Sequence, residues 1–319
     1  MSLLSQTFPP KPTFTERDVP DLSGKVFLVT GSNTGVGKEI ANILYSKNAT
    51  IYIAARSEAR AQSAISEIRD RNVESTGILK FLHLDLSDLT SCARTANVFL
   101  ADESRLDGLF NNAGVLAPPE GSKTSQGYEL QLGVNCLGHF LLAKKLIPLL
   151  QSTALITPNG HVRIVWVSSS AAENGGPEQG VPLDNLDYKN DKSSFYKYCV
   201  SKAGNYYQAT EFAKRYHEDG IKSVALNPGN LSSDLACTTG VILGCVHRLI
   251  SYPPKNGAYT AIYAAFSPDV TNGDWIIPFG RRGSVKKSLE RGAKDESEGG
   301  DGTARRFWQW QEEQIKPYM

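Results

Sequence analysis

A tyrosine and a lysine four residues apart are the pair in this chain best suited to proton transfer. Tyr198 and Lys202 lie in a segment predicted to be helical, residues 194–218, so both project from one helix face. A free phenol, with a pKa of about 10, is a poor proton donor or acceptor near neutral pH. A nearby ammonium stabilises the phenolate and brings that pKa toward the working range. Taken alone, the spacing more often marks a surface aromatic–lysine pair, so the interpretation depends on the surrounding motifs.

Two further groups could assist such chemistry. Three serines, Ser168, Ser169 and Ser170, follow an apolar run predicted to be a strand. A hydroxyl here could bond a substrate oxygen on which charge develops, or simply satisfy backbone groups at the strand end. Asn135 falls inside a predicted helix that begins near Leu130, where asparagine is unfavourable. Its apolar neighbours argue against an ordinary surface position.

A glycine-rich turn follows the first predicted strand, residues 26–30. Such glycines permit a tight turn and let the backbone approach a pyrophosphate at the start of the next helix. A Walker loop is excluded, because Ser32 replaces its first glycine and Glu39 follows Lys38 in place of Ser or Thr. A plain strand–helix turn is the alternative, although the position near the N-terminus favours nucleotide binding. The candidate residues are Gly31, Ser32, Asn33, Thr34, Gly35, Val36 and Gly37.

The end of the second predicted strand indicates which dinucleotide would bind. It reads Ala54-Ala55-Arg56-Ser57, with no carboxylate to accept from a ribose 2′-hydroxyl. A guanidinium is the natural partner of a 2′-phosphate, and the contact is worth about 1.5–3 kcal/mol. Arg56 and Ser57 therefore predict NADP(H), the alternative being a solvated arginine that opens a helix. Asp85, followed by Leu86, is a candidate acceptor for the adenine amino group or, alternatively, a helix N-cap.

Strand-like and helix-like segments alternate along most of the chain, which predicts parallel strands with helices on both faces. Six strands are predicted by apolar runs, at residues 26–30, 51–55, 79–84, 108–111, 162–167 and 223–226. The charged, glycine-rich stretch 281–306 is predicted to be a mobile surface loop. Beyond it, Phe307, Trp308 and Trp310 are expected to dock a final helix on the body.

Composition narrows the function classes. The 319 residues are 40% hydrophobic and carry a net charge of +1, which implies neither a nucleic acid nor a membrane surface as partner. We expect no signal peptide and no membrane span, since no apolar run reaches the roughly 18 residues required. Five scattered cysteines without a CxxC pair favour reduced thiols in the cytoplasm, with no metal site.

Motifs in a fixed order resemble those of the short-chain dehydrogenase/reductase family. The resemblance covers about Gly24 to Phe279. The motifs are TGSNTGVG at Thr30 to Gly37, Asp85 in LDLSD, Asn111-Asn112-Ala113-Gly114, Asn135, Ser169, Tyr198-Cys199-Val200-Ser201-Lys202 and Asn227-Pro228-Gly229. The segments GSNTGVGKE, AARS and LDNLDY are most similar to the retinol-dehydrogenase-like branch, which includes the oxidoreductase part of WW-domain oxidoreductases.

The resemblance implies a fold and a division of the chain. The fold is a single Rossmann-type α/β domain, doubly wound around seven parallel strands. An N-terminal extension (1–23) would precede the NADP-binding catalytic domain (24–280), and a charged loop with a C-terminal helix (281–319) would follow. Further cofactor contacts are implied at Asn111, Asn112, Ala113, Gly114, Tyr198, Lys202, Pro228, Gly229, Leu231 and Ser233. Ser233 stands where the family often has threonine, and Leu231 stands where it has valine.

The resemblance also assigns catalytic roles. Tyr198 would be the general acid, and Lys202 would hold the nicotinamide ribose. Lys202 together with oxidised nicotinamide would bring the pKa of the Tyr198 phenol toward the working range. Ser169 would orient the substrate oxygen, with Ser168 as the second candidate. Asn135 would sit at a local helix distortion that holds water between Lys202 and solvent. The implied activity is NADPH-dependent reduction of a carbonyl, or the reverse oxidation of an alcohol.

Substrate and assembly are less closely defined. The long segment 173–191 is expected to overhang the cleft, and the apolar segment 235–251 either covers the substrate as a lid or packs in the core. We therefore expect a fairly large apolar substrate, such as a secondary metabolite or a steroid-like ketone. Family members commonly dimerise through two long helices, so a homodimer is compatible with the resemblance. Two other functions remain open: NADP sensing without turnover, and a non-redox step such as cyclisation.

Overall fold

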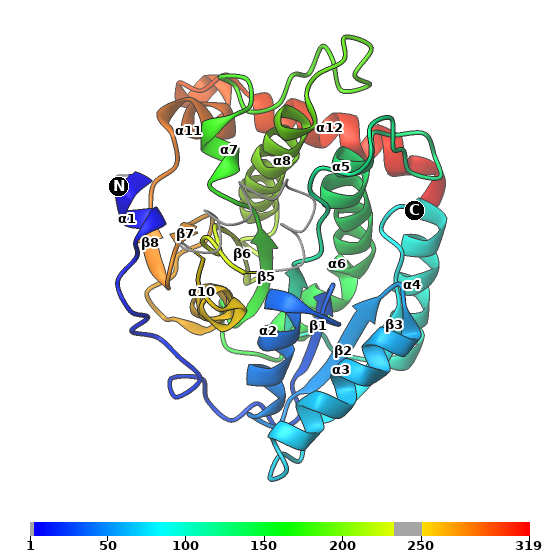
Figure 1. Cartoon of the computed structure of the whole chain (residues 1–319), viewed down its shortest axis with the longest axis vertical. Helices are drawn as coiled ribbons and strands as arrows, with labels where there is room; N and C mark the ends of the chain where they lie inside the picture. Colours follow the sequence, from blue (N-terminus) through cyan, green and yellow to red (C-terminus); the bar gives the residue numbers. More distant parts are fainter. Residues whose placement is uncertain (1–2, 233–250) are drawn as a thin grey trace.

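Short runs of apolar residues form the strands, and the segments between them form the helices. The computed structural model describes residues 3–232 and 251–319 (Figure 1). The strands are β1 (Val26–Thr30), β2 (Thr50–Ala55), β3 (Ile78–His83), β4 (Gly108–Asn111), β5 (Val162–Val167), β6 (Ile221–Leu226), β7 (Trp275–Ile277) and β8 (Arg281–Gly283). The helices are α1 (Leu3–Thr7), α2 (Gly35–Tyr45), α3 (Glu58–Arg71), α4 (Leu89–Asp102), α5 (Leu130–Leu132), the π-helix η1 (Gly133–Gly138), α6 (His139–Leu155), α7 (Ala171–Asn174), α8 (Ser194–Arg215), α10 (Pro254–Phe266), α11 (Lys287–Ala293), η3 (Glu296–Glu298), α12 (Thr303–Ile315) and η4 (Lys316–Tyr318).

The strands form one sheet in the order β3-β2-β1-β4-β5-β6-β7-β8. Strands β1 to β7 pair in parallel, and β8 pairs antiparallel to β7. The sequence-based expectation of seven parallel strands is confirmed, and β8 adds an eighth strand at the edge. The strand order reverses between β1 and β4, which leaves a crevice at their carboxyl ends where ligands bind in such folds.

Both faces of the sheet are buried, which explains why its strands are almost continuously apolar. In β1, Leu28 joins the core beneath α4, α6, α8 and α12, whereas Phe27 and Val29 join the core beneath α2, α3 and α10. Figure 1 shows these two helical layers on either side of the sheet. Two hydrophobic cores therefore hold the sheet in place from both faces. Residues at its carboxyl edge are positioned by this packing.

The charged stretch 281–306 is ordered, so the expectation of a mobile loop there is wrong. It contains β8, α11, η3 and the start of α12. Its charges pair with one another, as in the 3.1 Å contact between Arg305 and Asp295. Trp308 of α12 is buried, with its ring centroid 4.7 Å from that of Phe140 and 4.8 Å from that of Phe212. Charge density alone indicates solvation, but this docking holds the segment in place.

The helical stretch from Leu130 to Leu155 is long and apolar enough to cross a membrane by length and composition. No membrane span was expected from the sequence. Within the fold, 83% of the most apolar window of this stretch is buried, as expected for a core helix. The apolar character of α5, η1 and α6 is thus accounted for by their packing against the sheet.

Candidate active site

Tyr198 and Lys202 lie on the first half of α8, at the carboxyl edge of the sheet. Both are buried, with 7% and 4% of their surfaces exposed. The ammonium of Lys202 lies 5.7 Å from the centroid of the Tyr198 ring. Its Nζ donates to the Val167 carbonyl at 2.8 Å, at the end of β5, which holds the lysine beside the last turn of the strand.

Burial dominates the protonation of this pair. It raises the pKa of Tyr198 to about 12, against the opposing effect of a side-chain hydrogen bond with Ser169. Burial also lowers the pKa of Lys202 to about 8. In the chain without cofactor, desolvation of the phenolate outweighs any stabilisation by the lysine. Tyr198 is therefore a neutral phenol at pH 7 and carries a transferable proton. The expected fall of the phenol pKa requires oxidised nicotinamide as well as the lysine, so it stays a prediction for the chain with cofactor.

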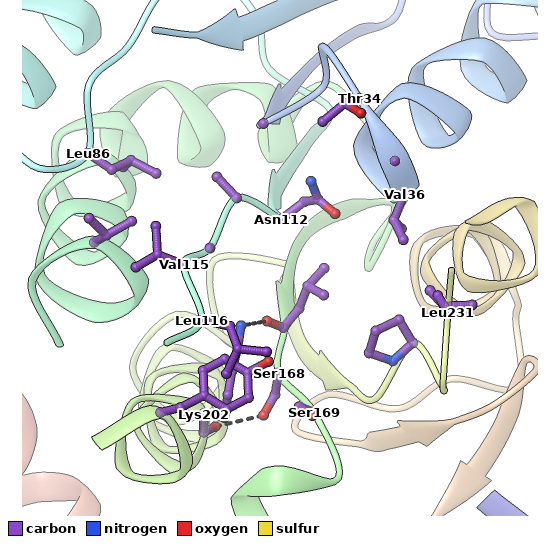
Figure 2. Close-up of a pocket in the computed structure, with 18 of the residues that line it drawn as sticks. Thr34, Val36, Leu86, Asn112, Val115, Leu116, Ser168, Ser169, Lys202 and Leu231 are labelled. Carbon is purple, nitrogen blue, oxygen red and sulfur yellow. Dashed lines mark hydrogen bonds between the residues drawn. The ribbon is translucent and has the colours of Figure 1, made fainter. Parts of the chain in front are cut away.

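The structure separates the roles of two adjacent serines. Ser168 is buried, and its hydroxyl donates to the Lys202 carbonyl at 2.6 Å. Ser169 shares a hydrogen bond with the side chain of Tyr198, and its Oγ accepts from the amide of Ala171 at 3.1 Å. Figure 2 shows both serines beside Lys202. These contacts favour Ser169 as the hydroxyl beside the reacting oxygen.

Asn135 lies in a stretch where the helix is locally widened. The segment Gly133–Gly138 is a π-helix between α5 and α6, in agreement with the expected distortion. The Asn135 side chain bonds both backbone groups of Val115, in the turn that follows β4. Oδ1 accepts from the Val115 amide at 2.8 Å, and Nδ2 donates to the Val115 carbonyl at 3.1 Å. Nδ2 also donates to the Ser201 hydroxyl on α8 at 2.9 Å. Asn135 thus joins three elements beneath the site.

The glycine turn between β1 and α2 is packed so closely that side chains are excluded. Gly31 has a φ of +65°, a conformation that favours glycine. A Cβ on Gly37 would lie 2.5 Å from Asn112 Nδ2 and 2.6 Å from the Gly31 carbonyl oxygen. Only glycine therefore lets the N-terminus of α2 reach the crevice, where its amides can face an anion.

A buried histidine connects this turn to the π-helix. Nδ1 of His139 lies 3.2 Å from the Asn135 carbonyl oxygen, which only accepts, so Nδ1 carries the proton. Nε2, 2.9 Å from Thr30 Oγ1, therefore accepts from the threonine hydroxyl. The same Oγ1 accepts from the amides of Asn112 and Ala113, both at 2.9 Å. Burial lowers the pKa of His139 to about 3, which keeps the ring neutral for this arrangement.

The opposite end of the crevice carries two arginines. Arg56 follows β2, and Arg60 lies one turn later on α3; both side chains are exposed. Ser57 is the N-cap of α3 and accepts from the Arg60 amide at 3.4 Å. Asp85 accepts from the Ser87 hydroxyl at 2.6 Å, whereas the N-cap of α4 is Asp88, so the N-cap interpretation of Asp85 is wrong.

A cavity of about 660 Å³ joins the two ends. It runs from Arg56 and Arg60, past the glycine turn, to Tyr198 and Phe195. Figure 2 shows Thr34 and Asn112 on one side, with Ser169 and Lys202 at the far end. A cavity of this size at the reversal of strand order suits an extended ligand with a phosphate-bearing centre.

Comparison with known proteins agrees with this architecture. The family model described as short chain dehydrogenase matches residues 25–181. A short-chain dehydrogenase/reductase from Phomopsis amygdali is 49% identical over 99% of this chain and 96% of its own. The short-chain dehydrogenase/reductase bet4 of Neocamarosporium betae is 44% identical over 100% and 94%. The chain belongs to the short-chain dehydrogenase/reductase family.

Solved structures show the same fold. An uncharacterised protein from Mycobacterium paratuberculosis superposes with a TM-score of 0.69 at 26% identity, covering 95% of this chain and 97% of its own. A complex of Pseudomonas aeruginosa RhlG with NADP gives 0.62 at 23% identity, covering 84% and 97%. The relatives' names do not specify a branch of the family, so the similarity to retinol dehydrogenases stays a prediction.

The nicotinamide cofactor implied by this family fits the cavity. Small or glycine positions line the middle, and cationic side chains lie at both ends. Most of the expected cofactor residues line the cavity: Gly31, Asn33, Thr34, Gly35, Val36, Arg56, Ser57, Asp85, Leu86, Asn112, Ala113, Gly114, Tyr198, Lys202, Pro228, Gly229 and Leu231. Ser32, Gly37, Asn111 and Asn135 lie outside the lining and support it from behind. Ser233 lies outside the described residues.

Sequence reasoning missed several lining residues. Arg60 could have been found, because it follows Arg56 by one helical turn. Val115, Leu116 and Phe195 carried no motif, and only the folded chain brings them to the cavity.

The segment expected to overhang the cleft packs on the core in part. Within 173–191, Val181, Leu186 and Tyr188 are buried, and Asn174 lines the cavity. Residues 235–250 of the expected lid lie outside the described residues.

Proposed function

We propose that this short-chain dehydrogenase/reductase is an NADPH-dependent reductase of a carbonyl on a fairly large apolar metabolite, or catalyses the reverse oxidation of the alcohol. Family membership makes it an oxidoreductase. One observation carries the finer proposal: Tyr198, Ser169 and Lys202 lie at one end of a cavity whose other end presents Arg56 and Arg60.

The chain's own residues account for proton transfer and orientation. When bound, the nicotinamide cofactor supplies the hydride for reduction or accepts it in oxidation. Tyr198, a neutral phenol because of its burial, donates its proton to the substrate oxygen. Ser169 bonds the same oxygen and stabilises the charge that develops there. Lys202 stabilises the resulting phenolate until it is reprotonated.

The preference for NADP(H) follows from charge at the adenosine end. Arg56 and Arg60 line that end together with the neutral side chains of Ala54 and Ala55. A 2′-phosphate would gain charge-assisted hydrogen bonds there. The carboxylate that accepts from a ribose 2′-hydroxyl in NAD sites has no counterpart at the end of β2.

The walls near Tyr198 support an apolar substrate. Leu116 and Ala171 pack with Tyr198 at this end, and Phe195, 56% exposed, also lines the cavity. Asn174 adds one polar side chain to the lining. An apolar body with a single carbonyl directed at Tyr198 matches this distribution.

Absorbance at 340 nm with a panel of carbonyl compounds tests the activity. We expect bulky ketones to be reduced faster than small sugars, and a preference for sugars would contradict the proposed substrate class. NADP sensing and a non-redox cyclisation are the alternatives, and neither would consume NADPH with any member of the panel.

Replacing Tyr198 with Phe tests the proton donor. The variant is expected to lose turnover by at least about 10²- to 10⁴-fold, the range for general acid catalysis, and still bind NADPH. Tyr196→Phe on the first turn of α8 is the matched control, because Tyr196 does not line the cavity. Wild-type turnover in Tyr198→Phe would remove Tyr198 from the mechanism.

A further inference from the structure

The π-helix beneath the site presents main-chain carbonyls to side chains of α8. The Asn135 carbonyl oxygen accepts from Asn205 Nδ2 at 2.6 Å, and the Cys136 carbonyl oxygen accepts from Gln208 Nε2 at 3.0 Å. Asn205 and Gln208 are three residues apart and therefore lie on one face of α8. Widening of a helix changes its internal hydrogen bonds, and two amide side chains here bond directly to the widened turn.

These contacts determine which way each amide points. A main-chain carbonyl only accepts, so Gln208 must direct Nε2 at Cys136 and Asn205 must direct Nδ2 at Asn135. Gln208 Oε1 then faces Asn205 and accepts from its Nδ2 at 3.1 Å. The remaining atom, Asn205 Oδ1, points at Lys202 Nζ, 3.4 Å away. The acceptor beside the lysine is therefore set by the π-helix.

The chain of amides is buried and anchored at its far end. Asn205, Gln208 and Gln311 are 3%, 1% and 1% exposed. Gln208 Nε2 also donates to Gln311 Oε1 on α12 at 2.5 Å, and Gln311 Nε2 donates to the Phe307 carbonyl at 3.3 Å. The Asn205 amide is bonded to the π-helix and to Gln208, which is bonded in turn to Gln311. Asn205 therefore cannot rotate without leaving buried polar groups unpaired.

We propose that Asn205 is a positioning residue for Lys202, which it holds by accepting one ammonium hydrogen while Val167 accepts another. The third hydrogen is left for the cavity, which Lys202 lines. An oxygen acceptor beside a buried ammonium stabilises its charged form. The inference rests on the proposed function, because it assigns Asn205 a role through the catalytic lysine.

The other titratable groups around Lys202 carry no negative charge that would stabilise its ammonium. Tyr198 faces it from α8, Cys136 from η1 and His139 from the start of α6. Burial raises the pKa of the Cys136 thiol and lowers that of His139, so both are neutral between pH 6.5 and 9. Burial likewise keeps Tyr198 protonated over that range. The neutral oxygens of Val167 and Asn205 are the acceptors that the described residues place beside the ammonium.

Asn205→Leu tests the proposal, because leucine fills the space without an acceptor. NADP⁺ affinity, followed by tryptophan fluorescence from pH 6 to 10, reads the charge on Lys202 without any substrate. The pH at which affinity is lost on the alkaline side is expected to fall by about half to one unit. A strong hydrogen bond to a charged group is worth about one pKa unit or more, and the 3.4 Å contact between Lys202 and Asn205 is longer than such a bond. The alkaline side of the kcat profile is expected to shift equally.

Two companion variants separate positioning from packing. Asn205→Ala leaves room for a water between Asn135 and Lys202, so we expect it to restore most of the wild-type pH profile. Asn272→Leu is the control, because Asn272 donates to the Ala213 carbonyl at the other end of α8, at 2.8 Å. If Asn205→Leu fails to fold, Asn205→Val is measured in its place with the same expected shift.

The role of Asn205 would be overturned if Asn205→Leu lost NADP⁺ affinity at the same alkaline pH as the wild type. An equal shift of that pH in Asn272→Leu would overturn it as well. Failure of the proposed function would look different. In that case Tyr198→Phe would retain turnover, or no carbonyl would consume NADPH.

Discussion

The two arginines at the adenosine end make a quantitative prediction about cofactor preference. Because Arg56 and Arg60 are exposed, each contact with a 2′-phosphate should be worth less than a buried charge-assisted bond, about 1–1.5 kcal/mol. That corresponds to roughly tenfold weaker NADPH binding for Arg56→Ala or Arg60→Ala. The two side chains would share one phosphate, so the double variant should lose about 30- to 100-fold, somewhat less than the sum.

The assay is the ratio of NADPH to NADH dissociation constants, measured by tryptophan fluorescence at fixed salt. Lost stability affects both cofactors alike, whereas loss of a phosphate contact affects NADPH alone. Arg69→Ala on the same helix, α3, is the control, since its exposed side chain does not line the cavity. An unchanged ratio in the double variant would refute the assignment of the 2′-phosphate to this end.

Two further predictions concern polar groups of the site and its support. Ser169→Ala should lower kcat by about 10²-fold, as for loss of one oxyanion donor. Ser168→Ala should instead lower the free energy of unfolding by about 1 kcal/mol, because the Ser168 hydroxyl donates to the Lys202 carbonyl. Equal rate losses in the two variants would contradict this division. His139, with a pKa lowered from 6.5 to about 3, contributes stability that is present above pH 6.5 and lost as the pH falls toward 3. The free energy of unfolding, measured with urea, should therefore fall as the pH is lowered from 6.5 to 4.5. His139→Gln should reduce this pH dependence by about 1.4 kcal/mol per pH unit. A variant with the same pH dependence as the wild type would exclude His139 as the cause.

Much of the architecture could be predicted because local patterns and tertiary packing agree. β1, β4 and β5 have the bounds expected from apolar runs. The carboxyl ends of parallel strands meet at one edge of the sheet, so residues that follow β2, β3 and β5 can line one cavity. Arg56, Asp85 and Ser169 follow these three strands, and all of them line the cavity.

Other features could not be predicted from local patterns. The 281–306 stretch is charged like a solvated loop, yet Trp308 docks against Phe140 and Phe212 from distant segments. Leu116 and Phe195 line the cavity although neither belongs to a sequence motif. In the chain without cofactor, burial raises the pKa of Tyr198, and burial depends on the whole surrounding fold.

The sequence by itself determined the family, the alternating sheet and helices, and the spacing of Tyr198 and Lys202 on one helix face. These follow from local periodicity and from glycines that tolerate no side chain. Only the tertiary structure decided that Ser168 is committed to the α8 backbone, and that the Asn205 amide is directed at the lysine by the π-helix. Hydrogen-bond direction and desolvation depend on contacts between residues far apart in the chain, and no local pattern encodes those contacts.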